Sequence, residues 1–278
     1  VMRVYRQYLK GKPAVVMSIV PHGATQLTAR PDTWSRYKRS IPEHSPVTDL
    51  TIRKGQDEFD RSIVPPAGAN PEIRLPEIWQ AELKNGIRVL GTQNTETPTT
   101  SMALRMEAGQ REESLNTLGI AALTAAMLNE STKLSTNEEL SDRLQKLGSS
   151  VSLGSGNNSA TLNVRSLTDN LRPTLAIASE RLLKPAFAED DFGRVKAQTL
   201  QAIAQNKTQA ESTAQLVFQK LVLGSENTIA HLDIGTERSI EKLMLKDVED
   251  FYTRHYSPSS ATLVIVSDLP KEKILTEL

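Results

Sequence analysis

Apolar and polar positions alternate regularly in only part of this chain. From about residue 77 onward, apolar residues recur with a period of two or near 3.6, which predict strands and helices respectively. Before residue 77 the pattern is interrupted by prolines at positions 31, 42, 46, 65, 66, 71 and 76. We therefore predict a folded module over 77–278, an irregular linker over 22–76, and the tail of a preceding module over 1–21.

The first residues predict a helix followed by a strand. VMRVYRQYLK (1–10) has apolar side chains at helical spacing, and PAVVMSIVP (13–21) is an apolar run typical of a buried strand. The order helix, polar break and apolar strand returns at 248–268, with Tyr8 in the position of Tyr256. This weak repeat indicates tandem modules, so we expect the chain to be a piece of a longer protein.

Strand signals occur in several places along the chain. Asn85-Gly86 between apolar positions predicts a hairpin or strand entry. The remaining predicted strands cover 47–53 in the linker, and 100–108, 149–156, 159–167 and 261–268 in the module. The strands 149–156 and 159–167 are expected to be joined near Asn157-Asn158.

Helical periodicity predicts six helices, at 117–129, 135–147, 169–183, 188–208, 210–223 and 239–254. Thr117 is the expected N-cap of the first helix. Ser135 and Glu138 are expected to form a capping box at the second, which ends at Gly148. Strands, a helix pair, strands and then a run of helices predict an α+β fold, with a mixed, mostly antiparallel sheet covered by helices.

Composition excludes several classes of function. The formal net charge is +0 and no basic stripe stands out, which argues against nucleic acid or an anionic membrane as partner. The chain has no cysteine, so disulfides, thiolate zinc sites and cysteine nucleophiles are excluded. No apolar run approaches the ~20 residues of a membrane-spanning helix.

The residues alone offer no catalytic constellation. The four histidines (His22, His44, His231 and His255) are too far apart in sequence to form a metal pair on one helix face, and are expected to be surface or capping residues. The acidic clusters 112–113, 138–139 and 189–191 are expected in loops or first helical turns, where they complement the helix dipole. Gly154-Ser-Gly156 is too short to indicate a phosphate loop.

Several motifs in order and spacing nevertheless resemble one family. They are LKNGIRVLGTQ (83–93), the acidic loop before GIAALTAAMLNE (119–130), the Leu147-Gly148 pair, FGRVKAQTLQAIAQNKT (192–208) and EKLMLKDVEDFYTRHYSPSSATLVIVSD (241–268). Over Leu83 to Asp268 the chain resembles the insulinase, or pitrilysin, family of inverted-zinc peptidases. The resemblance implies one module of the insulinase and mitochondrial-processing-peptidase-like fold.

The resemblance also explains the chemical blankness of the segment 119–130. It places the zinc motif H-x-x-E-H of that family on residues 122–126, where the two ligands and the base become Ala122, Ala126 and Ala125. The more distant glutamate ligand is expected around Gln201 or Ala202, and neither is a carboxylate. We therefore assign no catalytic and no metal-binding residue to this chain, and its substrate-binding residues stay unassigned.

The resemblance then implies a role within a larger protein. This segment would be the non-catalytic module that walls the peptide chamber of a zinc-dependent metalloendopeptidase acting on unfolded peptides. Its partners would be a catalytic half carrying zinc and the peptide, which we expect to bind by adding a strand to a sheet edge. Bacterial relatives imply a periplasmic or otherwise exported location, while a cytoplasmic one is not excluded.

Two alternatives remain open from the sequence. The chain could belong to a zinc-free assembly scaffold, like the core subunits of the respiratory cytochrome complex, or to a partner subunit whose catalytic mate is a separate chain. An intact H-x-x-E-H motif upstream would favour the peptidase, and a degenerate one the scaffold.

Overall fold

The computed structural model describes residues 2–12, 17, 19–27, 60, 62–64, 68 and 76–278. The chain divides into two units, residues 1–69 and 70–278. Within the described residues, no helix combines the length and apolar character needed to cross a bilayer.

The first unit confirms the predicted helix at the start of the chain. Helix α1 covers Met2–Tyr8, and a 3-10 turn, η1, covers Thr25–Leu27. The predicted strand at 13–21 is wrong where it is described, because residues 17 and 19–21 lie in no strand and Met17 is 79% exposed. A strand needs a hydrogen-bonded neighbour, and the described residues of this unit include no other strand. The predicted strand at 47–53 and His44 lie outside the described residues.

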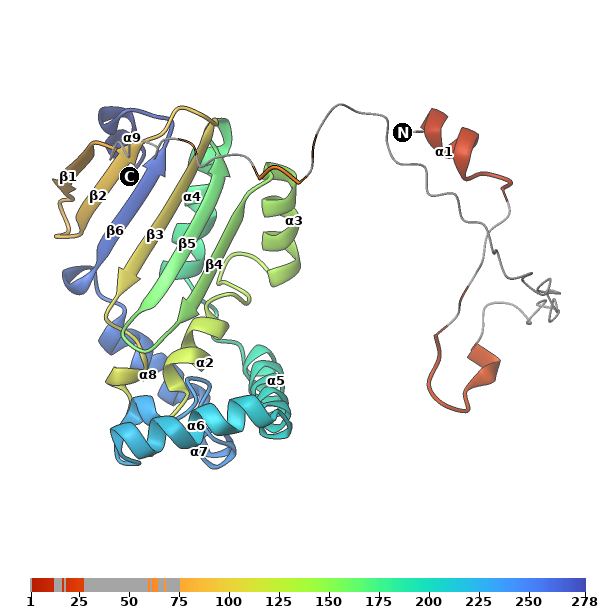
Figure 1. Cartoon of the computed structure of the whole chain (residues 1–278), viewed down its shortest axis with the longest axis vertical. Helices are drawn as coiled ribbons and strands as arrows, with labels where there is room; N and C mark the ends of the chain where they lie inside the picture. The colour runs from red at the N-terminus through yellow and green to blue at the C-terminus, as the bar shows by residue number, and fades with distance from the viewer. Residues whose placement is uncertain are drawn as a thin grey trace. The chain divides into compact units, whose positions relative to one another are not determined.

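The second unit is built on a six-stranded sheet with the order β1-β2-β6-β3-β5-β4 (Figure 1). Its strands are β1 (Ile78–Glu82), β2 (Arg88–Gln93), β3 (Thr99–Met106), β4 (Ser150–Ser155), β5 (Ala160–Leu167) and β6 (Thr262–Ser267). Only the β2–β6 pair is parallel within this sheet. The predicted α+β class with a mixed, mostly antiparallel sheet is confirmed.

The Asn85-Gly86 turn joins β1 to β2 as predicted. Gly86 has φ = +86°, in the left-handed region where glycine carries no steric cost. The Asn85 side chain accepts a hydrogen bond from the backbone N–H of Ile87 at 3.3 Å. Local turn chemistry therefore sets the register of this edge hairpin.

The helices mostly follow the predicted ranges. They are α2 (Ile120–Met127), α3 (Asn137–Leu147), α4 (Leu171–Leu183), α5 (Glu189–Thr208), α6 (Ala210–Leu223), α7 (Glu237–Lys242), α8 (Leu245–His255) and α9 (Lys271–Glu277). Short 3-10 turns cover Gln110–Glu112 (η2), Thr168–Asn170 (η3), Thr228–Ala230 (η4) and Pro258–Ser260 (η5). The sequence pattern did not predict α9.

The extent of one predicted helix and the position of a capping box differ from the prediction. The helix predicted at 239–254 is two helices, because the backbone is extended at Leu243 and Met244. The side chain of Asp247 accepts the N–H of Met244 at 2.8 Å and so starts α8 afresh. The capping box of α3 lies one residue later than predicted and is formed by Thr136 and Glu139.

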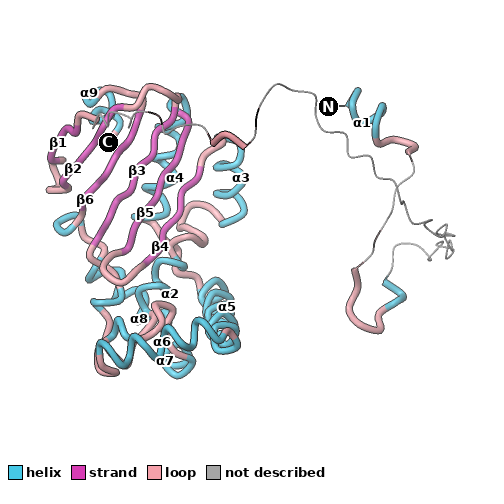
Figure 2. Tube along the Cα trace, in the orientation of Figure 1, coloured by secondary structure: helices cyan, strands magenta, loops and turns pink. Residues whose placement is uncertain are grey.

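The two faces of the sheet have different surroundings. Helices α3 and α4 pack with the apolar side chains of one face in a shared core, whereas the strands run uncovered toward the viewer in Figure 2. A second core joins α2, α5, α7 and α8, which gather at one end of the sheet. The sheet therefore presents one helix-covered face and one face that no helix of residues 76–278 covers, which we call the open face.

Candidate functional site

The alanine face of α2 is the first candidate site, because it carries the positions that resemble a zinc motif. Ala122, Ala125 and Ala126 lie at helical spacing, so their methyl groups share one side of the helix. Ala125 is 1% exposed, while Ala122 and Ala126 are half-buried. Helix α2 packs against α5, α8 and β4. The prediction that this face is packed is confirmed.

A carboxylate from the preceding loop starts α2. The side chain of Glu113 accepts the N–H groups of Gly119 at 3.0 Å and Ala121 at 2.9 Å, two donors that the helix itself leaves unpaired. The expected N-cap is wrong, because the Thr117 hydroxyl instead lies 2.9 Å from that of Ser114. Gly119 has φ = +90°, and a Cβ there would lie 2.5 Å from the carbonyl oxygen of Ile234.

The environment of Glu113 changes its acidity. Burial raises the pKa of Glu113 to about 7, although its two backbone hydrogen bonds favour the charged form. Asp233 adds a smaller effect in the same direction as burial. The predicted role of the 112–113 cluster at a helix start is confirmed, with one buried carboxylate as the cap.

The side chain of Asn129, just after the end of α2, binds the backbone of β4. Asn129 donates to the carbonyl oxygens of Ala125 at 2.9 Å and Leu153 at 2.8 Å, and it accepts the N–H of Leu153 at 2.9 Å. Leu153 belongs to β4, the edge strand of the sheet. The sequence places Asn129 at the end of a predicted helix but gives no signal for this distant partner.

Charged and polar side chains from several parts of the chain meet at the same end of α2. Glu130 accepts from Arg194 at 2.5 Å and from Asn137 at 2.9 Å. Arg181 is 6% exposed and donates to the carbonyl oxygen of Val151 at 2.5 Å, and burial lowers its pKa. Since each member comes from a different element, the sequence pattern could not bring these residues together.

The residues at the expected zinc positions do not fit that metal. Zinc in proteins takes nitrogen, sulfur or carboxylate ligands, and the alanine face of α2 supplies methyl groups. On α5, Gln201 is exposed and Ala202 is half-buried, so this helix adds no carboxylate at either expected position. Among the described residues, no three His, Cys, Asp or Glu side chains form a cluster suited to a metal ion.

The histidines that the structure describes have structural surroundings. His22 is exposed. A ring nitrogen of His231 lies 2.8 Å from the carbonyl oxygen of Ser225. His255 ends α8, stacks on Phe251 and lies 3.7 Å from a carboxylate oxygen of Glu112; burial lowers its pKa. These positions agree with the predicted surface or capping roles.

The other two acidic clusters also occupy first helical turns, as predicted. Glu138 and Glu139 begin α3, and the cluster 189–191 begins α5. Asp191 there pairs with Arg194 at 3.0 Å. Their negative charge complements the positive end of each helix dipole.

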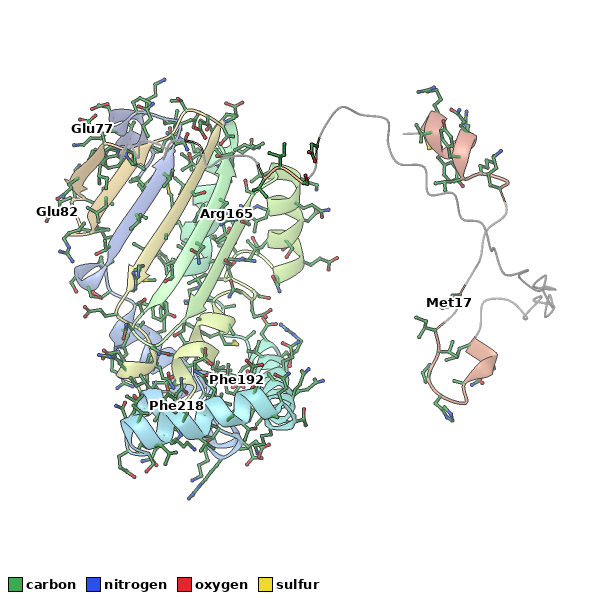
Figure 3. All side chains as sticks on the ribbon, in the orientation of Figure 1. Met17, Glu77, Glu82, Arg165, Phe192 and Phe218 are labelled. Carbon is green, nitrogen blue, oxygen red and sulfur yellow. The ribbon has the colours of Figure 1, made fainter. Side chains whose placement is uncertain are left out.

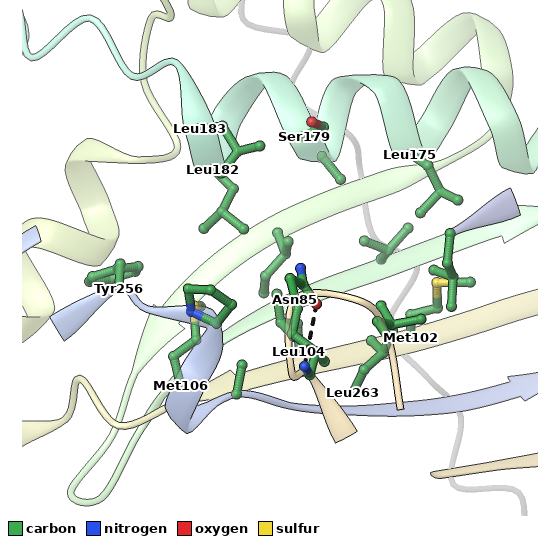
Figure 4. A pocket seen from close by; sticks show the side chains of 18 of the residues that line it. Asn85, Met102, Leu104, Met106, Leu175, Ser179, Leu182, Leu183, Tyr256 and Leu263 are labelled. Atoms are coloured by element: carbon green, nitrogen blue, oxygen red, sulfur yellow. Dashed lines mark hydrogen bonds between the residues drawn. The ribbon is translucent and has the colours of Figure 1, made fainter. Parts of the chain in front are cut away.

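An apolar cavity of about 500 Å³ lies between α4 and the helix-covered face of the sheet. Figure 4 shows Leu175, Ser179 and Leu182 of α4 above Met102 and Leu104 of β3. Tyr256 also lines the cavity, and its buried hydroxyl has no hydrogen-bond partner among the described residues. The cavity offers apolar surface and no cluster of catalytic groups.

Polar and apolar side chains share the open face. One row across the sheet runs from Ser152 through Asn163, Ala103 and Val264 to Leu90, as the strand pairing fixes it. Arg165 of β5, labelled in Figure 3, lies in the adjacent row between Ser150 and Ser101. These two rows supply hydroxyl, amide and guanidinium groups beside the apolar side chains of Ala103, Val264 and Leu90, so the face can contact a peptide through both polar and apolar groups.

Two curated relatives align with most of the chain. An uncharacterized zinc protease of Rickettsia bellii is 24% identical over 199 residues, which cover 71% of this chain and 48% of the relative. A non-peptidase homolog, YmxG, of Helicobacter pylori is 25% identical over 202 residues, which cover 73% of this chain and 46% of the relative. The chain therefore spans about half the length of these curated relatives.

Solved structures share the fold. A peptidase M16 inactive domain from Pseudomonas fluorescens superimposes with a TM-score of 0.69 at 26% identity, over 72% of this chain and 49% of that one. The periplasmic protease PqqL of Escherichia coli gives a TM-score of 0.65 at 18% identity, over 73% of this chain and 24% of that one. The model of the insulinase family (peptidase family M16) matches residues 88–228, just over half of the sequence, and the chain belongs to this family.

Proposed function

We propose that this chain supplies the non-catalytic module of a zinc-dependent metalloendopeptidase and that its open face walls the peptide chamber. The alanine face of α2 carries the proposal, because methyl groups at positions 122, 125 and 126 can neither bind a metal nor transfer a proton. Ala125 is buried and the other two alanines are half-buried, so this face is at least partly packed.

The relatives support this assignment in two ways. One relative is a non-peptidase homolog, and one solved structure is an inactive peptidase domain. The alanine face suggests the same lack of peptidase activity for this chain. Other relatives carry the name of a protease, and this chain covers about half of their length or less. Zinc and the catalytic residues would then belong to another module of the same protein or to a separate catalytic subunit.

The module would act by holding an unfolded peptide against the catalytic half. A wall that binds weakly by itself contributes when both halves meet the same peptide, since the second contact becomes intramolecular. The proposed module covers 77–278, with 22–76 as linker and 1–21 as the tail of a preceding module. A periplasmic location is proposed only because the similar protease PqqL is periplasmic.

A metal titration tests the absence of a zinc site. The purified chain is expected to retain no stoichiometric zinc after dialysis and to cleave no unstructured peptide. Stoichiometric zinc, or cleavage that a chelator abolishes, would contradict the non-catalytic assignment.

A matched pair of charge substitutions in the full-length parent tests the wall. Asn163→Asp adds one negative charge on the open face, whereas Gln145→Glu adds the same charge on the exposed side of α3. We expect only Asn163→Asp to raise KM or change which peptides are cleaved, with the zinc content of the parent unchanged. Equal effects of the two variants, or none, would contradict the wall.

The similarity to a non-peptidase homolog supports a second candidate, a zinc-free assembly scaffold. The sequence of the parent upstream of this chain discriminates between the two. An intact H-x-x-E-H motif favours the peptidase, and a degenerate one favours the scaffold.

A further inference from the structure

We propose that Asn129 closes the β4 edge of the sheet, so that an extended peptide meets this module through the open face and not by strand addition at β4. The inference rests on the proposed function for its peptide partner. For β4 alone, it differs from our expectation from the sequence that a sheet edge would bind the peptide, and it names the residue responsible.

Strand β4 lies at one edge of the sheet. This strand pairs with β5 on one side and forms the end of the sheet on the other. An unprotected edge of this kind offers a row of N–H and C=O groups, to which an extended peptide can add. Whether β4 can accept a peptide depends on what its outward-facing backbone groups already bind.

Both backbone groups of Leu153 in β4 bind the side chain of Asn129. Its N–H donates to the side-chain oxygen of Asn129, and its C=O accepts from the side-chain nitrogen. A residue of a neighbouring antiparallel strand would exchange the same two bonds with Leu153. One amide side chain thus occupies the place that the backbone of an added peptide would need.

A third hydrogen bond holds the Asn129 side chain in the orientation that binds Leu153. The second N–H of the Asn129 amide donates to the carbonyl oxygen of Ala125, one turn earlier on α2. The amide therefore makes three hydrogen bonds in a single orientation, and rotation by 180° would break all three. A peptide competing for Leu153 would have to replace a preorganised group and leave a half-buried amide without partners.

Other groups bind backbone carbonyl oxygens on both sides of Leu153. Buried Arg181 donates to the carbonyl oxygen of Val151. Beyond the end of β4, the backbone N–H groups of Gln110 and Arg111 donate to the carbonyl oxygens of Gly156 and Asn157 at 3.0 Å each. Groups from α2, α4 and the η2 loop thus bind the β4 edge at successive points.

The closed edge lies beside the alanine face. Asn129 follows Ala122, Ala125 and Ala126 at helical spacing, one turn nearer the C-terminal end of the segment. The same segment that carries alanines at the expected zinc positions therefore also withdraws the adjacent edge from peptide binding. On the β4 side of the sheet, the surface left to a peptide is the open face, whose exposed side chains include Ser152, Asn163 and Val264.

Hydrogen exchange in the whole 278-residue chain tests the closure. In Asn129→Leu, which keeps the side-chain size but removes the amide, the Leu153 N–H is expected to exchange about 10- to 100-fold faster. Asn129→Asp still accepts this N–H and is expected to retain most of its protection. Asn163→Leu makes the same change on β5 and serves as the control.

A second measurement does not depend on the folding of any variant. A blocked hexapeptide of alternating valine and threonine is added to the unmodified chain at millimolar concentration, and the exchange of the β4 amides is followed. We expect no added protection at Leu153. Added protection there, or unchanged Leu153 exchange in a folded Asn129→Leu variant, would overturn the proposal.

These outcomes are independent of the proposed function. The exchange of the Leu153 amide reports on this chain alone, without zinc and without the catalytic half. The wall could therefore fail in the parent while the β4 edge proves closed, and an open edge would not exclude a wall.

Discussion

Glu113 is the residue whose ionisation most directly affects the fold. Its pKa is raised to about 7 in the folded chain, from 4.5 when exposed, so the folded state holds the proton more tightly than the unfolded state. The stability that this difference contributes is fully present below pH 4.5 and is lost as pH rises through 7. Over this window we expect the contribution to fall by about 3 kcal/mol.

The variant Glu113→Gln isolates this effect. Glutamine keeps an acceptor for one of the two α2 N–H groups and does not titrate, so the free energy of unfolding of the variant is expected to lack this pH-dependent contribution between pH 4.5 and 7. Urea unfolding of both proteins at several pH values measures the difference. A constant difference across the window would show that Glu113 titrates alike in the folded and unfolded chain.

At Tyr256 we expect removal of a polar group to leave the fold as stable as before or more stable, because the hydroxyl is buried without a hydrogen-bond partner among the described residues. Its hydroxyl has no hydrogen-bond partner in the described chain, and burial raises the pKa of Tyr256. Tyr256→Phe removes an unsatisfied group and keeps the ring, so we expect it to be neutral or to stabilise the fold by about 1 kcal/mol. A destabilisation of similar size in chemical unfolding would indicate that the hydroxyl is hydrogen-bonded in solution.

At the scale of elements, the sequence predicted the helices, strands and turns that depend on residues close together in the chain. The strands, the Asn85-Gly86 turn and most helices follow from apolar periodicity and turn chemistry. The errors arise where a distant or competing group decides, as when Glu113 replaces Thr117 at the start of α2 and Asp247 starts a new helix within 239–254. The packing of the alanine face was predictable because small side chains leave room for neighbouring elements.

The alanine face of α2 can be tested with two identical substitutions. Ala125→Glu places a carboxylate at a position that is 1% exposed and is expected to cost ~3 kcal/mol or more, because burial removes the charge from water. Ala126→Glu is expected to cost about 1 kcal/mol, because that side chain is half-buried and can turn toward water. Thermal and urea unfolding measure both variants. Equal costs would show that both positions face the same environment.

At the scale of the whole molecule, the site depends on contacts that the sequence does not display. Asn129 and Leu153 are 24 residues apart, and Arg181 reaches Val151 from a different helix. Apolar periodicity predicts β4 as a strand, but not that it is an edge or that side chains close it. The alanines at the expected zinc positions are readable from the sequence, whereas the peptide surface that we propose could be argued only from the fold.

The organisation of the chain gives the last prediction, which concerns residues 1–76. Both apolar cores consist of residues from Trp79 onward, and the first strand of the sheet begins at Ile78. A chain that starts at Glu77 also keeps the hydrogen bond from Thr92 to the carbonyl oxygen of Glu77. We therefore expect removal of 1–76 to change the Tm by no more than about 2 °C, since each kcal/mol shifts a domain of this size by roughly 2–4 °C.

Circular dichroism of both chains during heating provides the measurement. The helical signal of 77–278 should be retained and lost in one cooperative transition, because the module carries its own cores. Limited proteolysis gives an independent control, with first cuts expected in the proline-rich stretch 64–76 rather than in α5. A fall in Tm of more than about 5 °C would mean that the first 76 residues contribute to the core of the module. The proposed boundary at residue 77 would then be wrong.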